Sequence, residues 1–220
     1  MSRELPILFN SEMVRANLDG RKSCTRRLVK GFVPDDAIWG YTAFTPKGYI
    51  SCRGTFADGY GEKFFKLPCE PGDILYVRET VWQKTGHYLD VDGETKAVWC
   101  NEFKYVATDE KPETGWNYSW VKRPSIHMPK EAARIWLKVT DVRVERLQEI
   151  TEDGAKAEGA NFKNGKNVGF EEKMNRTAIE RFAEIWNSTI KKADLDRYGW
   201  DASPWVWVIE FEQCEKPEEN

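Results

Sequence analysis

A short segment near the amino terminus, Gly20-Arg21-Lys22-Ser23-Cys24-Thr25-Arg26-Arg27, carries the residue types that suit the binding of an anion. Four of its eight residues are basic and none is acidic, and two hydroxyls and a thiol lie among them. The segment follows a predicted short helix, so the end of that helix is followed by Gly20 and then by the basic residues. Guanidinium and ammonium groups in this density favour a phosphate or carboxylate ligand.

A carboxylate that can complete this site is Glu158, far along the sequence. Thr151 has the character of a helix N-cap and is followed by two acidic residues, and Gly159 is a typical helix stop. Glu158 is therefore predicted at the carboxyl end of a short helix. The helix dipole is negative there, so its pKa is expected to rise unless a cation lies near.

Composition limits the classes of protein that fit. The chain has 220 residues, 40% hydrophobic and 31% charged, which suits one large domain or one domain with long insertions. We expect a single domain over residues 1–214 and a disordered acidic tail over 215–220. A net charge of −3 argues against a general DNA-coating protein. Ten tryptophans are many for this length and predict either a Trp-rich core or rings that line a cavity or stack on a ligand.

The cysteines and histidines indicate neither a metal site nor a disulfide framework. The five cysteines are odd in number and form no C-x-x-C pair, and there are only two histidines. We expect no metal and no cofactor. Without a signal peptide or a long apolar run, the expected compartment is the cytoplasm, with no membrane partner.

The elements that must position the two halves of the site are short. Leu5–Phe9 predicts a strand, and Asn10 and Ser11 predict the start of a helix that Gly20 ends. Residues 74–82 form a nearly continuous β-rich run, which predicts a strand buried on both faces. Arg78 and Glu79 are expected to end this strand. Charges at the end of a buried strand are expected to pair or to face a cavity.

The remaining pattern predicts two insertions and a final layer of strand and helix. The insertions lie at about residues 31–66 and 83–120, and strands at 97–99 and 103–106 predict a hairpin in the second. Two prolines predict a stiff, extended segment over 124–129. The other predictions are a strand over 135–144 with a bulge near 140–141, a helix over 170–186, a polar loop over 191–199 and a strand over 205–211.

Four segments in this order resemble the ASCH family: residues 20–27, residues 71–80, residues 147–159 and residues 205–211. The first matches the pattern G-R-K-x-x-T-x-R. The likeness is greatest to the longer ASCH proteins of bacteriophages and prophages. The resemblance implies an α+β fold, a PUA-like β-barrel flanked by short helices with long insertions, and a bacterial host cytoplasm. It also implies RNA or a nucleoside as the ligand.

Small bacterial members of that family remove the acetyl group from acetylated cytidine with a Lys, a Thr and a Glu. By the motif these residues fall on Lys22, Thr25 and Glu158. Amide hydrolysis needs a nucleophile, a base and an oxyanion stabiliser. Thr25 suits the nucleophile, Lys22 the base if the neighbouring arginines lower its pKa, and Glu158 the general acid/base. The alternative is that Lys22 and Arg27 pair with phosphate or carboxylates and Thr25 is structural.

Two further interpretations use other residues of the chain. Cys24 lies in an electropositive segment that should favour a thiolate, which makes it a competing nucleophile. In a binding module or a ribonuclease, cations would contact phosphates and aromatic rings would stack on the bases of single-stranded nucleic acid. The candidate ligand-binding residues are Arg21, Ser23, Arg26, Arg27, Arg78, Glu79, Trp82, Tyr105, Lys122, Arg123, Ser125 and Trp205. A phage accessory protein that binds a host protein is the third possibility.

Overall fold

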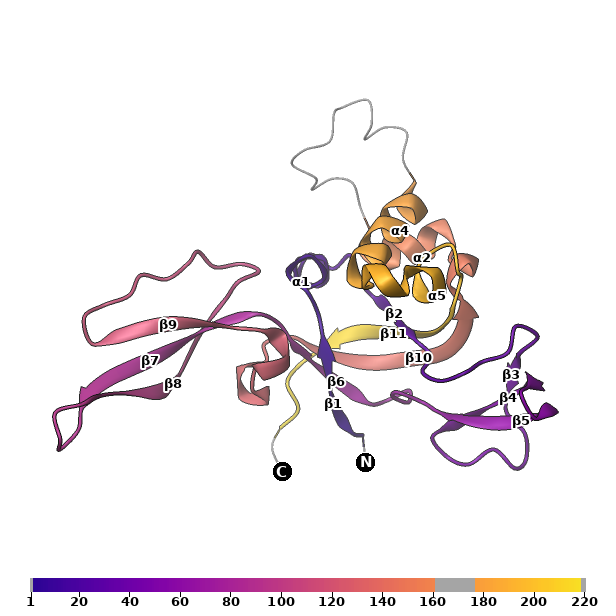
Figure 1. The fold of residues 1–220 in the computed structure, drawn as a ribbon, viewed down its shortest axis with the longest axis horizontal. Helices are drawn as coiled ribbons and strands as arrows, with labels where there is room; N and C mark the ends of the chain where they lie inside the picture. Colours follow the sequence, from indigo (N-terminus) through magenta and orange to yellow (C-terminus); the bar gives the residue numbers. More distant parts are fainter. Residues whose placement is uncertain (1, 161–176, 219–220) are drawn as a thin grey trace. The chain divides into compact units, whose positions relative to one another are not determined.

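The computed structural model describes residues 2–160 and 177–218, and the chain divides into two compact units. Unit 1 comprises Met1–Gly20, Ile74–Leu137 and Gln213–Asn220, and unit 2 comprises Arg21–Asp73 and Lys138–Glu212. The described part is a mixed α+β structure, mostly sheet with a few short helices (Figure 1), which confirms the predicted class. No closed barrel is detected among the described strands.

Unit 1 begins with strand β1 (Glu4–Leu8) and helix α1 (Ser11–Leu18), as predicted. The side chain of Asn10 accepts a hydrogen bond from the Met13 backbone and caps the helix, and Gly20 after its end has a φ of 70°. β1 lies parallel to β6 (Ile74–Arg78), which the first residues of β10 (Trp136–Arg146) flank. Burial in β6 alternates, so the prediction of a strand buried on both faces is wrong.

The second sheet of unit 1 is antiparallel, with the order β8-β7-β9. Its strands are β7 (Val81–Leu89), β8 (Thr95–Tyr105) and β9 (Tyr118–Arg123). The predicted hairpin with strands at 97–99 and 103–106 is wrong, because residues 97–105 belong to the single strand β8, whose partner is β7. Ser125–His127 forms a 3-10 turn, so the segment after Pro124 is not extended throughout.

Unit 2 contains β2 (Cys24–Leu28), which lies antiparallel to β11 (Trp205–Cys214), with β10 on the other side of β11. The first insertion forms its own antiparallel sheet. The strands of this sheet are β3 (Ile38–Gly40), β4 (Tyr49–Phe56) and β5 (Gly59–Lys66). Strands β10 and β11 each have residues in both units.

Helices α2 (Glu152–Ala157), α4 (Ala178–Thr189) and α5 (Leu195–Tyr198) gather in unit 2 (Figure 1). Apolar side chains of α2 and α4 pack on one face of β2 and β11 in a core that includes Leu147, Phe182, Trp186, Val206 and Val208. The prediction of a loop over 191–199 is wrong, since α5 lies there. Phe170 and Met174, predicted in the helix over 170–186, lie outside the described residues.

The bulge predicted near residues 140–141 would lie within strand β10. The buried side chains change phase along it, from Leu137 and Val139 to Val142, as the sequence alternation indicated. The bulge itself stays a prediction.

Candidate functional site

Strand β2 fixes which residues of the basic segment share a face. Successive side chains of a strand point to opposite faces. Cys24 and Leu28 pack in the core under the helices, so Arg26 between them lies on the helix-covered face, where its guanidinium is 5.9 Å from the Phe182 ring centre. Thr25 and Arg27 lie on the opposite face.

The two halves predicted from sequence meet directly in unit 2. The Lys22 ammonium donates to the Glu158 carboxylate at 2.7 Å, with 0% and 4% of the two side chains exposed. It also donates to the Cys24 and Glu158 backbone carbonyls at 2.7 and 3.0 Å. A backbone bridge between Lys22 and Glu158 adds to this contact. Three acceptors therefore surround one buried ammonium group.

The local structure explains why Glu158 reaches this position. The Thr151 side chain accepts from the Gly154 backbone and starts α2, Glu158 is the C-cap, and Gly159 follows with a φ of 85°. The Ser23 backbone N–H donates to the Ala157 carbonyl at 2.9 Å. The last turn of α2 is thereby joined to the segment before β2, and the negative helix end receives the cation Lys22.

Burial sets the electrostatics of Lys22. Loss of hydration lowers its pKa below the ordinary value, and this effect outweighs the raising effect of the Glu158 carboxylate. A buried lysine with a lowered pKa suits proton transfer.

Arg26 is the second cation at the carboxylate. It lies 3.5 Å from Glu158 and 3.2 Å from Glu145 through its two terminal nitrogens. Its side chain is 3% exposed, and its Nε–H has no hydrogen-bond partner. A buried donor without a partner is costly, so Arg26 is a candidate donor to a ligand.

The Thr25 hydroxyl is fully buried and also has no hydrogen-bond partner. It is therefore not within hydrogen-bond reach of Lys22 or Glu158 in this structure. The structure brings Lys22 and Glu158 together, and leaves Thr25 apart from their hydrogen-bonded cluster.

Cys24 does not have the environment that the sequence suggested. Burial in the core raises the pKa of its thiol to about 12, with a further raising effect of Glu158. The expectation of a favoured thiolate is wrong, because the neighbouring cations do not offset the loss of hydration.

A hollow of about 380 Å³ adjoins this cluster. Arg26 and Ser23 line it on the side of β2, and Thr151, Asp153 and Gly154 line it on the side of α2. Its walls carry positively charged hydrogen-bond donors, Arg26 and Arg143, and negatively charged acceptors, Asp153 and Glu210. A small polar molecule suits such a hollow better than a long anionic polymer.

The sequence reasoning missed Arg143, which also lines the hollow. Its guanidinium bonds Asp141 at 2.9 Å, Glu145 at 2.5 Å and Glu210 at 2.5 Å. The alternation Asp141-x-Arg143-x-Glu145 was the available signal, because such residues share one face of a strand. Glu145 bonds both Arg143 and Arg26 and so connects this wall to the buried ion pair.

The other predicted residues of unit 2 have structural contacts. Arg21 donates to the Gly159 carbonyl at 3.2 Å. Burial lowers the pKa of Arg27, which lies on the Thr25 face. The Trp205 indole N–H donates to the Pro34 carbonyl at 3.1 Å, and Arg146 lies over its ring. The stacking role of Trp205 stays a prediction.

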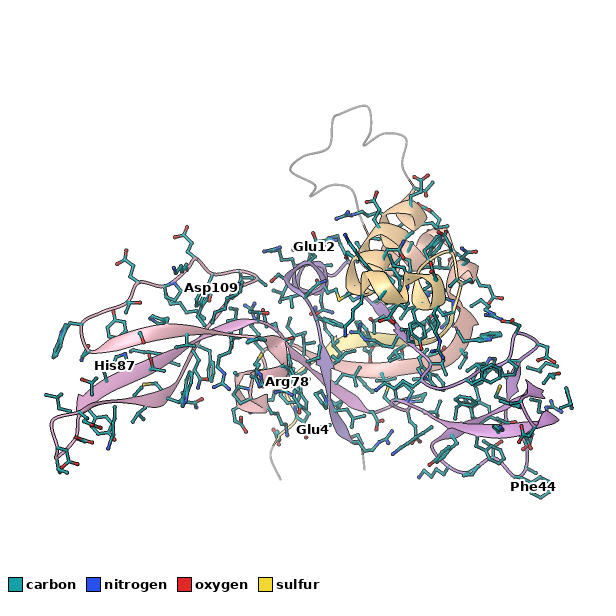
Figure 2. The ribbon with its side chains drawn as sticks, viewed as in Figure 1. Glu4, Glu12, Phe44, Arg78, His87 and Asp109 are labelled. Carbon is teal, nitrogen blue, oxygen red and sulfur yellow. The ribbon has the colours of Figure 1, made fainter. Side chains whose placement is uncertain are left out.

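Arg78 and Glu79 in unit 1 are paired, as charges at a strand end require. The Arg78 guanidinium, labelled in Figure 2, donates to the Met128 and Ile126 carbonyls at 2.7 and 2.5 Å. Glu79 is 1% exposed and accepts from Arg134 at 2.8 and 3.1 Å. Both residues hold the segment after β9.

The remaining predicted residues belong to or follow the β8-β7-β9 sheet. The Tyr105 hydroxyl donates to the Ala132 carbonyl, and Arg123 donates to Gln83 and lies over the Trp99 ring. Ser125 opens the 3-10 turn. Trp82 is half-buried and Lys122 is exposed, with the ammonium 5.7 Å from the ring centre.

No protein-family model matches the sequence, and neither curated proteins nor solved structures give a match. Among residues 2–160 and 177–218, no group of three or more His, Cys, Asp or Glu side chains is placed to hold a metal ion. None of the helices described here is long and apolar enough to cross a membrane.

Proposed function

We propose that the protein binds a modified nucleoside in the hollow beside Lys22 and Glu158 and hydrolyses its acyl amide, as in the acetylcytidine amidohydrolases of the ASCH family. The observation that carries the proposal is the buried Lys22–Glu158 pair beside the unpartnered Nε–H of Arg26. The resemblance of the basic segment supplies the substrate class, and a PUA-like barrel is part of the same proposal.

The chemistry divides between the two members of the pair. Neutral Lys22, whose lowered pKa favours that form, takes the proton of the attacking oxygen. Glu158 receives this proton through their hydrogen bond and delivers it to the departing amine. Arg26 donates to the oxygen that becomes negative as the carbonyl is attacked. With water as the attacking oxygen, the products are the free nucleoside and the carboxylic acid. With Thr25, the acyl group first forms an ester on its hydroxyl oxygen as the nucleoside leaves, and a water molecule then hydrolyses that ester to release the acid and restore the hydroxyl.

The attacking oxygen is either Thr25 or a water molecule. The resemblance favours Thr25, whose hydroxyl is buried without a partner. Attack by Thr25 requires its hydroxyl to come within hydrogen-bond reach of the base. Attack by water requires that a water molecule in the hollow, which Arg26 lines and Lys22 and Glu158 do not, come within hydrogen-bond reach of Lys22.

The test is release of cytidine from N4-acetylcytidine by the purified protein, followed by chromatography. Glu158→Gln keeps the shape of the side chain and is expected to lower turnover by about 10² to 10⁴-fold, the usual effect of losing a general acid or base. Absence of turnover in the native protein, or full turnover in Glu158→Gln, would contradict the proposal.

Thr25→Val separates the two nucleophiles. The hydroxyl has no partner, so its replacement by a methyl group is expected to leave stability unchanged or higher. Loss of turnover in this stable variant assigns the attack to Thr25, and unchanged turnover assigns it to water. Thr85→Val in unit 1 is the matched control, since its buried hydroxyl bonds Ser119 at 2.7 Å and its loss should affect stability alone.

The alternative of RNA binding without chemistry is favoured by a specific feature of unit 1, the interleaved lysines and aromatic rings of its antiparallel sheet.

A further inference from the structure

One face of the β8-β7-β9 sheet carries alternating tryptophans and lysines. Residues directly opposite in an antiparallel pair share a face. Trp82 of β7 lies opposite Lys104 of β8 and Lys122 of β9, and Lys84 of β7 lies opposite Trp120. The set Trp82, Lys84, Lys104, Trp120 and Lys122, with Tyr118 opposite Gly86, is called the Trp/Lys face below.

The geometry of this face suits two adjacent bases. Trp82 and Trp120 are diagonal neighbours on β7 and β9, and such positions are about 7 to 8 Å apart. This separation is roughly twice the thickness of an aromatic ring, so each indole can receive one base of a strand. Both indoles are half-buried and so are held in place while one part stays accessible.

Each aromatic ring has an ammonium group beside it. Lys104 lies 5.9 Å from the Trp120 ring centre, Lys84 lies 5.0 Å from that of Tyr118, and Lys122 lies 5.7 Å from that of Trp82. Lysines 104 and 122 are exposed. A base that stacks on the ring can displace the ammonium, which then pairs with the phosphate of the same nucleotide.

The segment between β8 and β9, in which Figure 2 labels Asp109, forms a wall over part of this face. Its Pro112 is buried, and its Lys111 lies 6.0 Å from the Trp82 ring centre. The hollow beneath has a volume of about 460 Å³ and is lined by Lys84, Lys104, Trp120 and the carboxylates of Glu110 and Glu113. These two carboxylates are acceptors beside the lysines.

The charges beside the rings bear on the occupant. Four lysines, 84, 104, 111 and 122, lie on or beside this face with four carboxylates, Glu102, Asp109, Glu110 and Glu113, and Lys84 is paired with Glu102 at 2.9 Å. A flexible polyanion with flat bases complements rings flanked by cations, whereas a duplex hides its bases within the stack. Glu110 and Glu113 would repel phosphate but accept a hydrogen bond from a ribose 2′-hydroxyl, which DNA lacks.

We infer that the Trp/Lys face binds single-stranded RNA by stacking two bases on Trp82 and Trp120 and pairing their phosphates with Lys104 and Lys122. This surface belongs to unit 1. The inference does not depend on the reaction proposed for unit 2.

The experiment is fluorescence anisotropy with a labelled 12-nucleotide oligouridine, titrated with the full chain at several salt concentrations. Trp120→Leu is expected to weaken binding about tenfold or more, since the loss of one stacking platform has an effect of that order. The double variant Lys104→Gln/Lys122→Gln is expected to lower the slope of log affinity against log salt by about 1.4, or about 0.7 per phosphate contact.

The matched control is Lys63→Gln in unit 2, because Lys63 also lies over an aromatic ring, 4.4 Å from the Phe56 centre. It should leave binding unchanged. A second arm uses oligodeoxythymidine and an RNA duplex of the same length, both expected to bind more weakly than the single-stranded RNA.

Three results would overturn the inference. They are no binding at low salt, binding that the Trp120 and lysine variants do not alter, and equal or tighter binding of the DNA strand or the duplex. Lys104 and Lys122 are exposed, so the double variant should fold normally. It therefore still tests the inference if the Trp120→Leu variant does not fold. Turnover of N4-acetylcytidine is measured with the same variants. Unchanged turnover together with weaker RNA binding shows that the RNA surface is separate from the proposed reaction.

Discussion

Among single residues, Glu158 is the one whose replacement is expected to affect most of the buried charges of the candidate site. Its carboxylate is the counter-ion of Lys22 and also lies 3.5 Å from Arg26. Removal of the carboxylate leaves two buried cations, of which Arg26 keeps the carboxylate of Glu145 and Lys22 keeps the neutral backbone carbonyl of Cys24. Removal of the Lys22 ammonium leaves a carboxylate that still has Arg26. The two partners of one ion pair therefore differ in their expected effect on stability.

We expect Glu158→Gln to lower the free energy of unfolding by about 3 to 5 kcal/mol, the range for breaking a buried ion pair. Lys22→Met should have a smaller effect, and the double variant should recover part of the loss. Urea denaturation of the three variants measures these differences. Equal losses in the two single variants would show that Arg26 does not compensate for Lys22.

The second residue-scale prediction concerns Cys24. Its pKa of about 12 leaves almost no thiolate at pH 8, so iodoacetamide should not modify it in the folded protein. Cys100 and Cys214 are partly exposed and should react, and all five cysteines should react in urea. Peptide mapping checks the pattern, and rapid modification of Cys24 in the native protein would contradict it.

The same raised pKa of the Cys24 thiol determines the direction in which folding stability changes with pH. The folded state holds the Cys24 proton more tightly than the unfolded state, whose thiol has a pKa of 9.0. This contribution is present in full below pH 9 and is lost as the pH rises toward 12.

Among elements, helix α2 is short, and its ends determine where Glu158 lies. Gly159 follows the helix with a φ of 85°, a conformation that disfavours a residue with a Cβ. Gly159→Ala is expected to lower stability by about 1 kcal/mol. It should also lower turnover of N4-acetylcytidine at least about tenfold, because a small displacement of a catalytic group has a large kinetic effect.

Gly93→Ala is the control for this prediction. Gly93 has a φ of 81°, so the strain is similar, but it lies in the turn between β7 and β8. Thermal denaturation should show similar losses of stability for both variants. Equal turnover in both variants would show that α2 does not position Glu158.

The sequence predicted elements whose signals are local. Asn10 and Thr151 cap the helices that they were expected to cap, because a side chain and the backbone two or three residues later settle that question. Strand β8 was divided in error, because exposed polar residues such as Asn101 and Glu102 hide its alternation. Its continuity comes from pairing with β7, which no local pattern contains.

The candidate site shows the same limit. Lys22 and Glu158 are 136 residues apart, and the resemblance to a family, not spacing, paired them. The wrong expectation for Cys24 came from counting nearby charges without knowing that the core buries the thiol. Charge is readable in a sequence, whereas burial depends on elements that only the fold brings together.

At the scale of the whole molecule, the chain path links the two units. The chain crosses from one unit to the other after residues 20, 73, 137 and 212, and neither unit is a continuous segment. Strands β10 and β11 have residues in both. Loss of order in one unit therefore frees the ends of strands that the other unit needs, so unfolding should be cooperative.

We expect a single unfolding transition in guanidinium chloride, with the same midpoint by tryptophan fluorescence and by circular dichroism. Thr85→Val in unit 1 and Gly159→Ala in unit 2 should each shift that one midpoint without dividing the transition. The shift should follow stability alone, so the slope of free energy against denaturant should stay constant. Two separated transitions, each sensitive to only one of the variants, would show that the units unfold independently despite the four crossings.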